Sequence, residues 1–316
     1  MNDPEFTPHE PEQDLFPAPE LALPLATEFT DEPTELFQSW SQPEPVAPMR
    51  IPHLGHLALL AAFLIFGVVC MMVAMMIALH FHFDGVSSLD QIKTNIHYLL
   101  GSEAVLYLVT FSLSFFIFPL FWNKSFFEGI HWRGKTALRL YWQLPAIALG
   151  CIALAAIDDK FLPGPSKAPI EDIFRSPGAA WLMFGFGVTL APFFEEIGFR
   201  GFLLPSLATA WDWTIEKSTG KPAPPLDENG HPQWSIFATV IASIATSLPF
   251  ALMHAEQTAW SLGPFLLLFV VSLILCAVRV RTRSLAASTL VHSCYNFLIF
   301  STALISTDGF RHLDKM

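Results

Sequence analysis

The sequence predicts an all-α, polytopic membrane protein with about seven or eight transmembrane helices and a disordered acidic N-terminal tail. Three observations support this fold class. Hydrophobic residues make up 53% of the 316 residues. Charged residues make up only 14%, against about 25% in a soluble domain. The apolar residues also gather in runs of roughly 20 residues, the length at which a helix crosses the hydrocarbon core of a bilayer.

The N-terminal segment, residues 1–50, is rich in proline and in acidic residues and holds most of the net charge of −11. Such a composition cannot bury enough apolar surface to offset the entropy of ordering the chain. We therefore expect a disordered acidic Pro-rich tail that serves as a solvated tether or as a docking arm for a partner. The acidic balance offers no basic surface to nucleic-acid phosphates, so we expect no nucleic-acid partner.

The body of the chain holds seven apolar runs, at 57–79, 104–122, 138–157, 178–194, 235–253, 262–278 and 285–305. We assign 51–177 to N-terminal transmembrane helices, 178–305 to a second group of membrane helices and 306–316 to a C-terminal tail. Residues 211–234 are polar and contain prolines and glycines, which predicts an extramembrane loop.

Lysine and arginine residues predict the orientation in the bilayer. More of them fall in segments on the side of the tail than on the opposite side. Because cytoplasmic loops carry an excess of these residues, we expect an integral protein of the plasma (inner) membrane with a cytoplasmic N-terminus.

Ionisable side chains interrupt the later runs, and such side chains are costly inside a membrane and typically functional. Three polar clusters stand out: Glu195, Glu196 and Arg200; Phe250 and His254; and His292 and Asn296.

Helical spacing separates the roles of the two adjacent glutamates. Residues four apart share a helix face, so Glu196 faces Arg200 and His292 faces Asn296. Glu195 lies about 100° away from Glu196 and points elsewhere. Two neighbouring carboxylates in a low dielectric resist ionising together. Arg200 would keep Glu196 charged and leave Glu195 free to exchange a proton.

The depth of these groups in the membrane sets a further condition. If the fourth helix ended at Phe194, Glu195 and His254 would lie at opposite membrane surfaces. They can meet if this helix is longer, about 181–210, and a kink at Pro249 would lift His254 into the bilayer. We therefore expect the glutamates to lie within the membrane and to face a water-filled cavity.

The order EExxxR, FxxxH and HxxxN on successive apolar helices resembles the CPBP family. This family comprises CAAX proteases and bacteriocin-processing enzymes related to the type II CAAX prenyl endopeptidase. The resemblance covers about residues 178–305. It implies an intramembrane endopeptidase that hydrolyses a peptide bond in a membrane-associated peptide or protein substrate, lipidated or not.

The resemblance also implies a role for each motif residue. Glu195 is the general base, helped by His254, and activates a water molecule. His292 and Asn296 donate hydrogen bonds to the oxyanion, and Glu196 and Arg200 form a supporting ion pair. Because the chain has no HExxH motif, we favour a mechanism without a cofactor. A zinc-dependent variant stays open, since two histidines and a glutamate can bind zinc.

Two other classes of function fit some of these features. Buried Glu and His also form proton relays in proton-coupled transporters, although such proteins commonly contain repeats and none is detectable here. A non-catalytic membrane scaffold or immunity protein could recruit a partner through its tail. We assign no function to the histidines outside the clusters, His80, His82, His97, His131 and His231. We interpret Cys70, Cys151, Cys276 and Cys294 as small buried hydrophobic residues.

Overall fold

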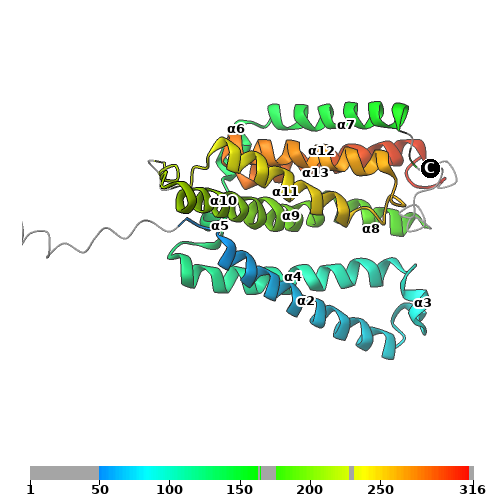
Figure 1. Cartoon of the computed structure of the whole chain (residues 1–316). Helices are drawn as coiled ribbons and strands as arrows, with labels where there is room; N and C mark the ends of the chain where they lie inside the picture. Colours follow the sequence, from blue (N-terminus) through cyan, green and yellow to red (C-terminus); the bar gives the residue numbers. More distant parts are fainter. Residues whose placement is uncertain (1–49, 163, 165–175, 228–230, 313–316) are drawn as a thin grey trace, which may run out of the picture. The chain divides into compact units, whose positions relative to one another are not determined.

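The computed structural model describes residues 50–162, 164, 176–227 and 231–312, and in these residues every regular element is helical (Figure 1). The all-α prediction is therefore confirmed. The predicted tail lies outside the described residues except for Arg50. In chain order the elements are α2 (Leu54–His80), η1 (Phe83–Gly85), α3 (Leu89–Ile92), α4 (Ile96–Trp122), α5 (Phe126–Gly129), α6 (Gly134–Arg139), α7 (Gln143–Phe161), α8 (Pro177–Val188), α9 (Leu190–Glu196), η3 (Ile197–Leu203), α10 (Leu204–Thr219), α11 (Ile236–Met253), α12 (Leu262–Thr282) and α13 (Leu285–Ser306).

The first two long helices, α2 and α4, pack side by side and are joined at one end by η1 and α3 (Figure 1). Asn95 caps the start of α4, and its side-chain oxygen accepts hydrogen bonds from the backbone N–H groups of His97 and Tyr98. This cap satisfies donors that the first turn of a helix leaves unpaired. At the other end of the pair, Phe118 and Trp122 of α4 pack with Phe202 of η3. These ring contacts tie α4 to the helix that carries the paired glutamates.

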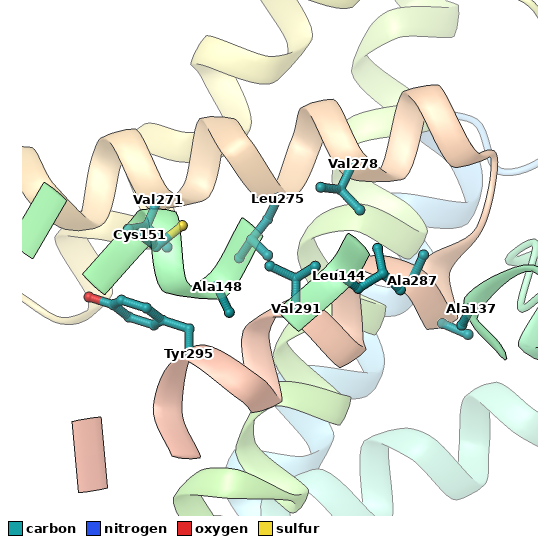
Figure 2. Close-up of a cluster of buried hydrophobic side chains, with 11 residues drawn as sticks. Ala137, Leu144, Ala148, Cys151, Val271, Leu275, Val278, Ala287, Val291 and Tyr295 are labelled. Atoms are coloured by element: carbon teal, nitrogen blue, oxygen red, sulfur yellow. The ribbon is translucent and has the colours of Figure 1, made fainter. Parts of the chain in front are cut away.

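A second core forms where α7, α12 and α13 meet, as Figure 2 shows. Leu144 and Ala148 of α7 lie against Leu275 of α12 and Val291 of α13, and all four are buried. Of the four cysteines, Cys151 and Cys276 are fully buried and Cys70 and Cys294 are half-buried, and all four are free thiols. Each thus occupies the place of a small apolar side chain.

The helix that carries the glutamates runs from Pro177 to Thr219, a stretch of 43 residues, with a single irregular residue, Thr189, between α8 and α9. The expected length of about 181–210 was therefore too short at both ends, but the expected continuity past Phe194 is observed. Within this stretch η3 is a π-helix. A π-helical turn is rare and is frequently found at functional sites. Glu195 and Glu196 lie just before it, near the middle of the long helix.

Within the residues that the structure describes, six helices are long and apolar enough to cross a membrane, one fewer than the seven runs of the sequence. The difference is run 138–157. It divides between α6 and α7, and α7 ends in Asp158, Asp159 and Lys160, so its apolar part is short. Helix α7 nevertheless packs along both α12 and α13.

The expected loop at 211–234 is also shorter than predicted. Helix α10 continues to Thr219 and ends at Gly220, whose φ of 71° is the left-handed conformation that glycine adopts easily. The prediction extended the loop over residues 211–219 because they are polar, but they form the end of α10, which is amphipathic rather than wholly apolar. The non-helical segment therefore begins at Gly220, and Ser235 caps the start of α11.

Candidate active site

The paired glutamates end α9, and Glu196 is the more deeply buried of the two. Glu196 and Arg200 have no exposed surface, and Arg200 Nη1 lies 2.8 Å from Glu196 Oε1. Arg200 Nη2 donates to the backbone oxygen of Ser272 at 3.1 Å and to Ser272 Oγ at 2.6 Å. A buried charge needs such pairing to offset its desolvation. This ion pair therefore fixes the end of α9 against α12.

His292 of α13 binds the same carboxylate. Its Nδ1 lies 3.1 Å from Glu196 Oε1. An ionised carboxylate only accepts hydrogen bonds, so Nδ1 carries the proton and donates it. The other ring nitrogen, Nε2, then faces Glu195 Oε2 at 3.8 Å. Glu196 thus orients His292 toward Glu195.

His254, the residue that directly follows α11, also lies near Glu195. Its Nδ1 lies 2.8 Å from the backbone oxygen of Phe250, so this nitrogen also donates. Its Nε2 lies 4.0 Å from Glu195 Oε2. Both distances to Glu195 exceed a direct hydrogen bond, which is about 2.7–3.2 Å for nitrogen and oxygen. Glu195 Oε2 is buried and has no hydrogen-bond partner among the described residues.

These side chains line a cavity of about 310 Å³ between α8, α9, α11, α12 and α13. Its polar lining residues are Glu103, Glu195, His254, Gln257, Thr258, His292 and Asn296. Its apolar lining includes Phe186, Leu268, Ile299 and Phe300. Asn296 Nδ2 donates to the backbone oxygen of Gly187 at 2.7 Å, which uses one of the two hydrogens of this amide. All four predicted catalytic residues therefore border one cavity, and Glu196 and Arg200 lie behind it.

Sequence reasoning missed the contribution of α4 to this cavity. Glu103 lines the cavity, and Tyr107 Oη donates to Glu103 Oε1 at 2.7 Å. Tyr107 also stacks on Phe194 with the ring centroids 4.7 Å apart. The signal was present in the sequence, since Glu103 and Tyr107 are four residues apart on one helix face. It was overlooked because the second run was taken to begin at 104, which left Glu103 in a loop.

Membrane-length helices thus bring Glu195, His254 and His292 to one cavity, with Glu196 directly behind it, an arrangement that fits the class of polytopic intramembrane hydrolases. The comparison with known families narrows this class. Residues 177–298 match the family described as type II CAAX prenyl endopeptidase Rce1-like, and this match supports assigning that segment of the chain to the family. No curated protein and no solved structure matches the chain.

The family match supports three statements about the protein. The protein is an enzyme, a CAAX-type intramembrane endopeptidase. It is an integral, multi-pass membrane protein. Its substrate is a membrane-associated protein. The matched segment contains Glu195, Glu196, Arg200, His254, His292 and Asn296, whereas Glu103 and Tyr107 lie outside it. None of the findings supports the transporter or the scaffold.

Proposed function

We propose that Glu195 is the general base of this endopeptidase and that His254 assists it. One observation carries the proposal. The Oε2 atom of Glu195 is buried, has no hydrogen-bond partner in the described part of the chain, and lies 4.0 Å from Nε2 of His254 and 3.8 Å from Nε2 of His292. A water molecule can bridge polar atoms at such separations, and a carboxylate can take a proton from that water.

Hydrolysis then proceeds in two steps, attack by water and cleavage of the peptide bond. The water oxygen forms a bond with the scissile carbonyl carbon while its proton passes to Glu195. The carbon–nitrogen bond of the peptide breaks when that proton reaches the leaving amine, directly or through His254 Nε2. The products are a carboxylate and an amine, and Glu195 returns to its ionised form.

Asn296 and His292 stabilise the negative oxygen that forms between these steps. The second hydrogen of Asn296 Nδ2 is available to the cavity, because the first is donated to Gly187 O. His292 donates from Nε2 only when its ring is protonated on both nitrogens, since Nδ1 already serves Glu196.

We also propose that the substrate is a protein with a prenylated C-terminal CAAX sequence. The family description names prenyl endopeptidases, and the apolar side of the cavity, with Phe186 and Phe300, suits a lipid chain. The protein resides in the plasma (inner) membrane with its N-terminus in the cytoplasm. Arg200 and Arg279 are buried, so they do not count as loop residues. Without these two, the segments on the side of the tail still contain more lysine and arginine residues than those on the opposite side.

We propose that the reaction needs no cofactor, and the second candidate is the zinc-dependent variant. Glu195, His254 and His292 would hold the ion, and zinc would supply a more acidic water. Among the described residues, however, no group of three or more His, Cys, Asp or Glu side chains is arranged to hold a metal ion. Extraction with EDTA and 1,10-phenanthroline separates the two candidates. Unchanged activity supports the cofactor-free mechanism, and a loss that zinc alone restores supports the zinc enzyme.

The central test uses the full chain in lipid nanodiscs with a fluorogenic farnesylated CAAX peptide. Glu195→Gln should lower kcat by about 10²–10⁴, the usual contribution of a positioned general base. Glu216→Gln, a change of the same kind on the same long helix but far from the cavity, should leave kcat unchanged. Equal rates for Glu195→Gln and wild type would refute the role of Glu195. Equal rates with the farnesylated and unmodified peptides would refute the prenyl preference while leaving the protease assignment intact.

Profiling of protein termini in membranes of cells expressing wild type or Glu195→Gln then identifies natural substrates. Termini that appear only with the wild type name the substrate class.

A further inference from the structure

A second polar cavity, of about 160 Å³, lies apart from the active-site cavity and shares none of its lining residues. It is enclosed by the connection between α5 and α6, the segment that leads into α11, and the C-terminal end of α12. The lining residues that matter here are His131, His231, Trp234, Thr239, Arg279 and Arg283. Its volume is roughly five times the share of one water molecule in the liquid, which is about 30 Å³.

Arg279 is the unusual residue of this cavity. It is only 3% exposed, and its Nε has no hydrogen-bond partner among the described residues. Its Nη2 lies 3.2 Å from Nδ1 of His131. No carboxylate of the described residues forms an ion pair with it, whereas the other fully enclosed arginine, Arg200, is paired with Glu196. A buried guanidinium with spare donors and no counter-charge is costly unless a ligand supplies the charge.

The neighbouring carboxylates are engaged elsewhere. Glu196 acts on Arg279 electrostatically but is bound by Arg200 and His292. Asp227 is engaged by Arg283 and by the backbone N–H of His231. Arg133 adds another positive charge, and both Arg133 and Arg279 act on His131. Burial and these charges lower the pKa of His131 to about 2, so its ring is neutral and Nδ1 can accept from Arg279. The cavity therefore has a positive interior.

Its position in the fold suggests the source of a matching anion. Arg50 donates to the backbone oxygens of Gln233 and Pro224, and Leu285 N–H donates to His131 O. The ends of α2, α11, α12 and α13 thus meet around the cavity. Ends of membrane helices lie at the level of lipid head groups, and basic pockets between such helices bind phosphate-bearing head groups.

We propose that this cavity binds a phosphate group, held by the guanidinium fork of Arg279 and supplied by an anionic phospholipid head group or by free phosphate. An arginine fork matches two phosphate oxygens with parallel hydrogen bonds. The bound phosphate neutralises Arg279 and links α12 to the segment before α11. The site does not depend on the roles proposed for the catalytic residues.

The test measures the thermal midpoint Tm of the full chain in a neutral detergent. One arm adds inorganic phosphate, with acetate at equal ionic strength as its control. The other adds short-chain phosphatidic acid, with diacylglycerol of the same chains as its control. At about 100 times the Kd a phosphate ligand should raise Tm by roughly 5 °C. A rise with both phosphate compounds indicates free phosphate as a sufficient ligand, and a rise with phosphatidic acid alone indicates the head group.

Variants then locate the site. Arg279→Gln should weaken binding at least tenfold, the factor that a lost charge-assisted hydrogen bond of about 1.4 kcal/mol gives. Arg281→Gln removes the same charge from an exposed position two residues away and should bind like wild type. If Arg279→Gln does not fold, Arg279→Lys retains the charge without the fork and should still weaken binding. The proposal is overturned if neither phosphate compound exceeds its control, or if the Arg279 variants bind as Arg281→Gln does.

Discussion

Individual residues at the active site can have both a structural and a chemical role, and Asn296 is the clearest case. Its amide nitrogen holds α13 to α8 through Gly187 O and borders the cavity beside His292. If its second hydrogen stabilises the oxyanion, removal should affect the transition state more than substrate binding.

We expect Asn296→Ala to lower kcat by about 10²–10³ with KM nearly unchanged, the usual result of losing one oxyanion donor. The lost hydrogen bond to Gly187 should cost about 1 kcal/mol of stability. Steady-state kinetics and thermal unfolding of the same preparation separate the two effects. A loss of stability with unchanged kcat would show that Asn296 has only a structural role.

His131 shows how a buried histidine links stability to pH. Its pKa falls from 6.5 to about 2 in the folded protein because of burial and the charges of Arg279, His231 and Arg133. Between these pH values the unfolded chain binds one proton more than the folded chain. The stabilisation is therefore complete above pH 6.5 and is lost progressively as the pH falls below it.

In phosphate-free buffer, this effect should lower the free energy of unfolding by roughly 2 kcal/mol between pH 7 and pH 5. His131→Gln can still accept from Arg279 but has no proton to gain, so its stability should change less over that range. Denaturant unfolding in micelles at the two pH values provides the comparison. Parallel curves for the two proteins would contradict this account.

At the scale of elements, the crossing of α8 and α13 depends on one glycine. A Cβ atom at Gly187 would lie 2.7 Å from Cε2 of Phe300, closer than carbon atoms approach in proteins. The same crossing carries the bond between Asn296 and Gly187 O. The close approach of these helices therefore sets one wall of the active-site cavity.

Gly187→Ala should destabilise the protein by about 1–3 kcal/mol, as overpacking does, and should lower activity by displacing Asn296. The double variant Gly187→Ala/Phe300→Leu creates space for the added methyl group and should recover much of both losses. Thermal unfolding and peptide hydrolysis are measured on each variant. A double variant as impaired as the single one would show that the Phe300 contact is not the cause.

The helices also show which features of the structure the sequence could predict and which it could not. The spacing of Glu196 and Arg200 predicted their contact, and the position of His292 in a run predicted its burial, because both follow from helix periodicity. The π-helix at Ile197–Leu203 was not predicted, since no residue pattern distinguishes it from an α-helix. Arg279 was missed as a site residue because its neighbour His131 is distant in sequence and approaches it only in the packed structure.

For the molecule as a whole, the remaining prediction is its direction in the membrane. Arg50, Gln233 and Arg283 belong to segments that meet at one end of the helices. The connection 83–95 lies at the opposite ends of α2 and α4. With a cytoplasmic N-terminus, Ser218 near the end of α10 should face the cytoplasm and Ser87 should face outward. Both side chains belong to exposed residues.

The orientation can be tested in a variant whose four native cysteines are replaced by alanine or serine. A single cysteine is then introduced at position 87 or at position 218. A membrane-impermeant maleimide added to intact cells should label Ser87→Cys and leave Ser218→Cys unlabelled, and permeabilised cells should label both. The reverse pattern would place the N-terminus outside.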